Sequence, residues 1–139
     1  MNSDALPGDI RRALWEKFVF LASLAGVTSV IRKPIGPIRE NPRTRALFLD
    51  AMREVVAVGR AEGVALASDF ADTRLAFADT LPAAMTSSMH GDLDHGYRLE
   101  VEWLSGDVVQ RGERLGVPTP VHRALNDVLV LYADGKPKA

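Results

Sequence analysis

The chain has 139 residues, which is enough for one compact domain and too few for two ordinary ones. Apolar residues make up 47% of it and charged residues 25%, a balance typical of a globular protein rather than a disordered one. The formal net charge of −1 argues against a general binder of nucleic acid or of anionic membranes, and the absence of cysteine excludes disulfides, thiolate catalysis and cysteine-ligated zinc.

The first ten residues carry acidic groups and a Pro7-Gly8 pair in place of the basic stretch and apolar run of a secretory signal. No apolar run approaches the length needed to cross a bilayer. From these two observations we expect a cytoplasmic location and no membrane partner.

The first predicted helix starts at Ile10, with Asp9 as its N-cap, and ends at Gly26, a residue type typical of the position after a helix. Its apolar residues recur at intervals of three and four: Leu14, Phe18, Leu21 and Ala25. Other apolar residues lie between them, so more than one face of the helix is apolar. Such a helix usually runs through the middle of a core.

Prolines and a glycine interrupt residues 27–40, which we expect to form a short helical piece and a loop. Asn41 and Pro42 are typical of a helix start, with Asn41 as the cap and Pro42 at the first helical position. This helix should reach Gly63, and Ser68 can cap a shorter helix that follows.

Three more helices are predicted in the second half of the chain. The hydroxyl residues at 86–88 can cap a short helix that ends in the glycine-containing segment 91–96. A long helix should begin near Leu99 and end at Gly116. Thr119 then starts a last helix, because a proline again follows a capping residue.

Evidence for strands is thin. Residues 27–31 have β-branched content but no partner run and no hairpin turn, and no repeat of fixed period or internal linker is visible. We therefore predict an all-α fold, a single compact domain over residues 1–139 with about six or seven helices.

Two charged residues stand out as candidates for chemistry. Lys17 lies between Trp15 and Phe18 in a mostly apolar helix. It either extends to solvent, as most helical lysines do, or is partly desolvated, which would make it a better proton donor near neutral pH. Glu100, near the start of the predicted long helix, is either a surface acid favoured by the helix dipole or the partner of a distant cation. Glu102 points elsewhere on that helix, so the two acids form no carboxylate dyad.

Ser88 and Asp92 are four residues apart, so a helix would place both on one face. They can bind a polar ligand or, more commonly, cap their own helix. His90 and His95 are five apart instead of four, which does not match a helical metal motif. No Gly-x-Gly-x-x-Gly or Walker motif occurs, and the basic residues of segment 32–45 are expected to form a solvated edge.

Three stretches, taken in order, resemble the ketopantoate reductase (2-dehydropantoate 2-reductase) family. The segment that holds the catalytic lysine of that family is similar to residues 14–18, Leu-Trp-Glu-Lys-Phe. Its most recognisable stretch is similar to Ser-Ser-Met at 87–89 followed by Arg-Leu-Glu-Val-Glu-Trp-Leu-Ser-Gly at 98–106. The Gly-Val-Pro-x-Pro ending matches residues 116–120, and the resemblance covers residues 9–132.

The resemblance implies the C-terminal helical domain of an enzyme that reduces 2-dehydropantoate to pantoate with NADPH, on the route to pantothenate. This domain resembles those of 6-phosphogluconate dehydrogenase-like proteins. It implies that Lys17 is the general acid that protonates the developing alkoxide, and that Glu100 orients the substrate hydroxyl and modulates Lys17. Ser88 would bind the polar end of the substrate, and Asp92 would support the local structure.

This sequence departs from the family pattern in two ways. Asparagines that contact substrate often follow the lysine by one and two turns, and here those positions hold Leu21 and Ala25. An apolar pair cannot donate the same hydrogen bonds, which leaves open a related 2-keto acid or no substrate. The second departure is that no NADPH-binding Rossmann domain is present in these residues, so we expect no cofactor to bind to the chain alone.

Two functions follow from these observations. The first is the substrate-binding and catalytic domain of an NADPH-dependent 2-keto acid reductase, inactive until a Rossmann domain is supplied in cis or in trans. The second is a free-standing, non-catalytic helical module for dimerisation or small-molecule binding. Apolar surface that a Rossmann domain normally covers should be exposed in this chain, and we expect a homodimer to cover it.

Overall fold

The computed structural model describes residues 6–137, and that part of the chain is all-helical, with no strand. In chain order the elements are α1 (Gly8–Ile31), α2 (Ile35–Glu40), α3 (Pro42–Ala61), α4 (Phe70–Ala78), α5 (Ser88–His95), η1 (Val101–Trp103), α6 (Ser105–Leu115), α7 (Pro120–Leu129) and η2 (Val130–Tyr132). Seven α-helices and an all-α fold confirm the prediction. Residues 1–5 and 138–139 of the expected domain lie outside the described residues.

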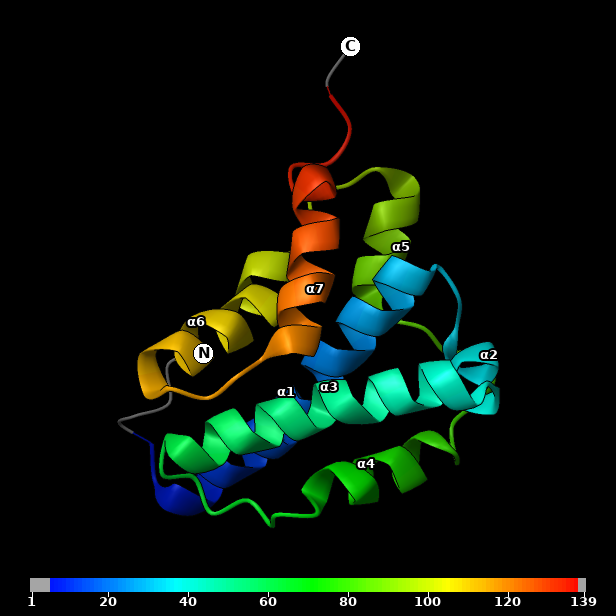
Figure 1. Cartoon of the computed structure of the whole chain (residues 1–139). Helices are drawn as coiled ribbons and strands as arrows, with labels where there is room; N and C mark the ends of the chain where they lie inside the picture. Colours follow the sequence, from blue (N-terminus) through cyan, green and yellow to red (C-terminus); the bar gives the residue numbers. More distant parts are fainter. Residues whose placement is uncertain (1–5, 138–139) are drawn as a thin grey trace.

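The longest helix, α1, forms the centre of the fold. It crosses behind α3, with α4 below and α5 and α7 above (Figure 1). Trp15, Val19 and Val27 of α1 are buried almost completely. By length and composition alone α1 could span a membrane, contrary to our expectation that no segment approaches this length, but 67% of its most apolar window is buried inside the domain. We therefore interpret α1 as the core helix that its several apolar faces predicted.

Helix α1 begins earlier than predicted. Its first residue is Gly8, and the carbonyl of Pro7 accepts the backbone N–H of Arg11 at 2.9 Å. Asp9 is therefore not the N-cap but an acid in the first turn, where it complements the helix dipole.

Helix α1 also ends later than predicted, at Ile31 instead of before Gly26. Gly26 is buried inside the helix because α7 packs against it: a Cβ there would lie 2.8 Å from Cδ1 of Leu125. The glycine marks a close helix contact and not a helix end. The end itself is formed by Arg32, whose φ of 59° is left-handed.

The packing of α2 and α3 against α4 uses the basic segment. Asn41 caps α3 as predicted, accepting the N–H of Arg43 at 2.9 Å. Arg39 donates to backbone carbonyls at the end of α4, and Arg45 binds both carboxylate oxygens of Asp79 at 2.7 and 2.8 Å. These two arginines therefore join elements and do not merely form the solvated edge that was expected.

Two predicted helix starts are wrong in detail. Helix α4 begins at Phe70, and the residue at its cap position is Asp69 instead of Ser68. The predicted long helix from Leu99 is broken into η1 and α6, because Leu104 has a non-helical backbone with φ −114° and ψ −100°. The N–H of Leu99 donates to the carbonyl of Ala133 at 2.8 Å, which holds this segment against the end of η2 instead of in a helix.

The start of α7 is capped by a residue distant in sequence. Thr119 precedes Pro120 as predicted but makes no side-chain cap. Instead the carboxylate of Glu54, on α3, accepts the N–H groups of Val121 at 2.8 Å and His122 at 2.9 Å. Burial raises the pKa of Glu54, and these two hydrogen bonds oppose that shift.

His122 is fully buried where α7 meets α3 and α6. Its Nε2 donates to the carbonyl of Ala51 at 2.9 Å, so its Nδ1, 3.0 Å from Oγ of Ser105, accepts the hydroxyl proton. Burial lowers the pKa of His122 to about 4, with the bond to Ala51 acting in the opposite direction. The imidazole is therefore neutral at physiological pH, and its role is structural.

Candidate active site

Lys17 lies on the solvent-facing side of α1. Its neighbours Trp15 and Phe18 turn into the core, while Lys17 itself is exposed. Lys17 makes no hydrogen bond or ion pair with any residue in the described range. Of the two interpretations of this lysine, the structure shows the one in which it extends to solvent.

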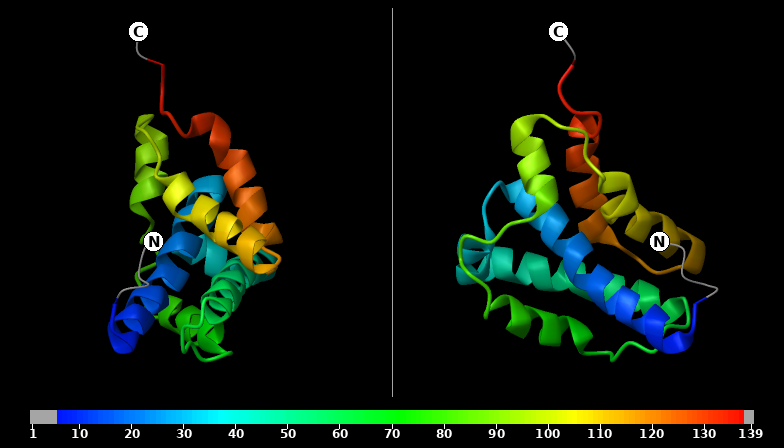
Figure 2. Two further views of the ribbon diagram at one scale, coloured as in Figure 1. Left: turned by 90° about the vertical axis from the view of Figure 1, so that its left-hand side faces the viewer. Right: turned by 180° about the vertical axis from the view of Figure 1, so that it is seen from behind.

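A hollow of about 420 Å³ opens beside Lys17, between α1 and α4. Seen from behind, α4 lies along the bottom of the molecule and α1 runs diagonally above it (Figure 2, right). The rings of Phe20 and Phe77 meet edge to face in its wall, with centroids 5.5 Å apart. The complete lining consists of Ala13, Glu16, Lys17, Phe20, Leu21, Arg74 and Phe77. The hollow therefore combines cationic groups with an apolar wall.

The two apolar positions that follow Lys17 have different environments. Leu21 is 44% exposed and lines the hollow. Ala25 is buried in a small cluster with Met89 and Leu99, beneath α5 and the segment before η1. Only Leu21 is thus open to a ligand, whereas Ala25 serves packing.

Ser88 is the first residue of α5, and the start of this helix is tied to α1. The hydroxyls of Thr28 and Ser87 are 2.7 Å apart, and Ser87 is the N-cap, accepting the N–H of His90 at 3.0 Å. Lys17 and Thr28 are eleven residues apart on one face of α1, about 16 Å along its axis. Because Ser87 provides the cap, the exposed hydroxyl of Ser88 is not needed for it, contrary to the more common interpretation.

Glu100 and Asp92 lie on either side of the turn after α5. Glu100 is exposed, and its neighbours Leu99 and Val101 pack in the cluster around Ala25. It precedes a 3-10 helix instead of starting a long α-helix, so its predicted dipole role is wrong. The backbone carbonyl of Asp92 accepts the N–H of Tyr97 at 2.8 Å, which helps to close the turn.

The structure thus attaches the elements that carry Lys17, Ser88 and Glu100 to one helix, α1, without joining the three side chains to each other. Within residues 6–137 no hydrogen bond or ion pair connects these three side chains, and none of them forms one with another residue. All three are therefore available to a ligand. Sequence reasoning missed Arg74 and Phe77, because only the packing of α4 on α1 brings them to the hollow.

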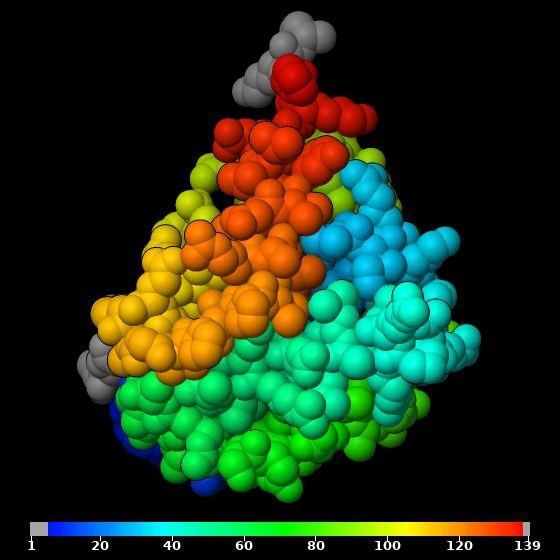
Figure 3. Space-filling model, viewed as in Figure 1, coloured from blue at the N-terminus to red at the C-terminus, as the bar shows by residue number. Residues whose placement is uncertain are grey.

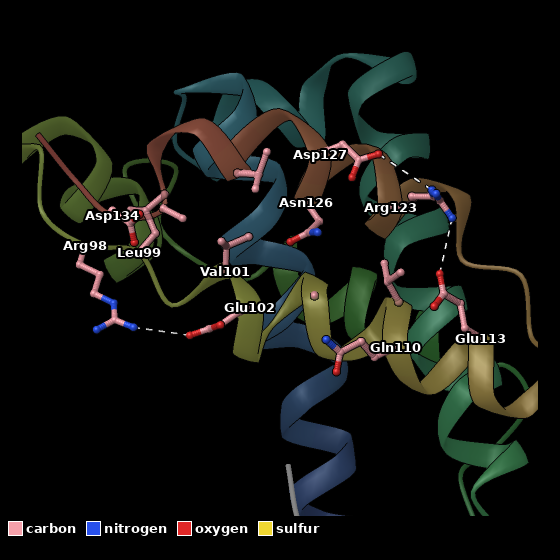
Figure 4. A pocket seen from close by; sticks show the side chains of 14 residues that line it. Arg98, Leu99, Val101, Glu102, Gln110, Glu113, Arg123, Asn126, Asp127 and Asp134 are labelled. Carbon is pink, nitrogen blue, oxygen red and sulfur yellow. Dashed lines mark ion pairs between the residues drawn. The ribbon is translucent and has the colours of Figure 1, made fainter.

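A larger hollow, of about 450 Å³, lies on another part of the surface, between η1, α6 and α7 (Figure 4). Both arginines in its lining pair with acids: Arg98 with Glu102 at 3.6 Å, and Arg123 with Glu113 at 3.6 Å and with Asp127 at 3.9 Å. None of the predicted site residues lines it. Size alone is a weaker indication of a binding site than cations without a counter-ion, so we favour the hollow at Lys17.

The histidine region offers no metal centre in the described part of the chain, where no group of three or more suitable ligands occurs. His90 is already engaged, with Nδ1 2.6 Å from the hydroxyl of Thr86 and Nε2 3.3 Å from Asp94.

Comparisons with known proteins place these observations in a family. The sequence model of the family described as ketopantoate reductase PanE/ApbA, C-terminal, matches residues 9–133. A 2-dehydropantoate 2-reductase of Halobacterium salinarum is 34% identical over 122 residues, which are 87% of this chain and 40% of that protein.

Solved structures agree with the sequence comparison. A dimeric ketopantoate reductase from Staphylococcus aureus superposes with a TM-score of 0.84 at 26% identity, over 92% of this chain and 45% of that one. A PanE/ApbA family ketopantoate reductase from Ralstonia eutropha gives 0.79 at 34% identity, over 94% and 42%. The chain spans less than half the length of these relatives. It belongs to the ketopantoate reductase family, whose C-terminal helical domain it matches.

Proposed function

We propose that this chain is the substrate-binding and catalytic helical domain of an NADPH-dependent reductase of 2-keto acids, which works together with a nicotinamide-binding domain. The observation that carries the proposal is the unpaired, exposed Lys17 on α1, in the stretch that resembles the lysine-bearing segment of the family. The unpaired Ser88 and Glu100, on elements attached to the same helix, support it. A cytoplasmic location belongs to the same proposal.

In the reduction of a 2-keto acid, this domain would bind the substrate and donate one proton. NADPH, when bound, supplies the hydride that forms the new C–H bond at the ketone carbon. The carbonyl electron pair moves onto oxygen, and Lys17 Nζ donates the proton that this oxygen needs. Before the transfer, the ammonium stabilises the growing negative charge. Lys17 then regains its proton from water, and Glu100 orients the group beside the reacting oxygen.

A complementation assay tests the proposal. The purified chain is mixed with NADPH and a 2-keto acid, with and without a Rossmann-domain fragment of a related reductase, and NADPH oxidation is followed. We expect turnover only in the complemented mixture, because nothing in this sequence forms a dinucleotide-binding motif.

The matched variants are Lys17→Ala and Lys33→Ala, since Lys33 is also exposed but lies in the loop after α1. Loss of the general acid should lower complemented kcat by about a hundredfold or more, and Lys33→Ala should leave it unchanged. Equal activity of the two variants would refute the role of Lys17, and turnover by the isolated chain would refute the need for a second domain.

The second candidate is a non-catalytic dimerisation module, and one surface favours it. Val128, Leu131 and Tyr132 are 51%, 88% and 48% exposed, an apolar group at the end of α7 and in η2. Figure 3 shows this part of the chain at the surface, in orange and red, next to α1 and α3. This function predicts a concentration-dependent dimer and no turnover under complementation.

A further inference from the structure

The hollow between α1 and α4 holds two cations and lacks a counter-ion for them. Lys17 and Arg74 both line it, and neither forms an ion pair or a hydrogen bond with a residue of the described range. The one acid in the lining, Glu16, lies 3.6 Å from Arg12 instead. Two unmatched positive groups at one hollow favour an anionic ligand.

Arg74 is held in place by aromatic rings. Its guanidinium carbon lies 5.2 Å from the ring centre of Phe70 and 4.8 Å from that of Phe77. Its Nε is buried without a hydrogen-bond partner. Stacking fixes the plane of a guanidinium and leaves its terminal N–H groups to bind a carboxylate with two parallel hydrogen bonds.

The rest of the lining is apolar. Leu21 is 44% exposed and Phe77 is 40% exposed, and Phe20 packs behind them. A volume of about 420 Å³ is in the range of small-molecule sites. Neither Leu21 nor the two rings can donate a hydrogen bond, so a ligand hydroxyl placed against them would lose its partner in water without gaining another.

We propose that this hollow binds a 2-keto acid through its carboxylate, at Arg74, and through an apolar side chain, against Leu21 and Phe77. The substrate class is then a 2-keto acid with a branched or aromatic hydrocarbon side chain instead of the hydroxylated 2-dehydropantoate. Lys17, in the same lining, is left for the ketone oxygen. The proposal rests on the function proposed above and names its substrate.

The test compares phenylpyruvate with 2-dehydropantoate. Dissociation constants are measured by calorimetry on the chain, and kcat/KM is measured in the complemented mixture. We expect phenylpyruvate to be favoured by about tenfold or more, the size of effect that an apolar pocket gives for a few matched carbon atoms. Arg74→Gln should weaken the binding of both acids by about tenfold or more, because it removes a charge-assisted pair.

Leu21→Asn should reverse the preference toward 2-dehydropantoate. Its control is Leu14→Asn, which also changes an exposed leucine of α1 but lies outside the hollow. The control for Arg74 is Arg123→Gln, on α7. Because Arg74 packs on two rings, Arg74→Lys is included: it keeps the charge and should retain part of the affinity if the fold is intact, which circular dichroism checks.

The outcomes separate this proposal from the proposed function. A preference for 2-dehydropantoate, or affinity unchanged by Arg74→Gln, overturns the substrate class even if complemented turnover still depends on Lys17. Phenylpyruvate binding that depends on Arg74 and Leu21, without complemented turnover, supports the site and removes the reductase function.

Discussion

Glu54 caps the start of α7, and the loss of unfolding free energy on removing this cap can be calculated from the structure. The carboxylate accepts the N–H groups of Val121 and His122, the second and third residues of α7, and Thr119 supplies no side-chain bond. Glu54→Ala leaves both N–H groups without this acceptor. Each such loss costs about 1 kcal/mol, so the free energy of unfolding should fall by about 2 kcal/mol.

This loss should appear in urea unfolding at pH 7 followed by circular dichroism, and in thermal unfolding as a midpoint lower by about 6 °C. The matched control is Glu40→Ala, at the end of α2, whose exposed carboxylate makes no hydrogen bond in the described residues. The reasoning is refuted if Glu54→Ala and Glu40→Ala lower the stability equally, since the cap would then contribute nothing measurable.

Two further predictions concern the buried imidazole of His122 and the close backbone contact at Gly112. The pKa of His122 is about 4 in the folded state and 6.5 ordinarily, so the unfolded state binds the proton first and stability should fall between pH 6.5 and pH 4, by about 3 kcal/mol in total. Urea titrations across this range should show the slope in the native protein and a flatter profile in His122→Gln. Gly112→Ala would place a Cβ 2.6 Å from the carbonyl oxygen of Val117 and should cost about 1–3 kcal/mol. Gly91→Ala, with nothing within 4 Å, should instead stabilise α5 by about 0.5–1 kcal/mol, and an equal thermal shift for the two glycine variants would contradict the packing.

Local signals in the sequence were sufficient where the cause is local. Asn41 caps α3 through a bond to a residue two positions away, and Gly116 ends α6 in a left-handed conformation with φ 71°. Long-range packing decided the positions that sequence reasoning placed wrongly. Gly26 was predicted to end a helix, but it lies inside α1 because Leu125 packs closely against it. The long helix predicted from Leu99 is interrupted at Leu104, because a hydrogen bond to Ala133 holds the segment before it.

The same distinction applies to the site. Lys17, Ser88 and Glu100 could be named because they lie in stretches that resemble family motifs, and all three are exposed. Arg74 and Phe77 belong to no motif. They reach the hollow only because α4 packs along α1, an arrangement that depends on contacts between segments more than fifty residues apart.

The division of α1 into a buried side and an open side has an evolutionary consequence. Trp15 and Val19 fill the core, so changes there would unfold the domain, whereas Leu21 lies one turn from Lys17 with nearly half of its surface in solvent. A substitution at Leu21 therefore costs little stability while it changes the wall of the hollow. The wall of the hollow can thus change by single mutations in a domain that stays folded.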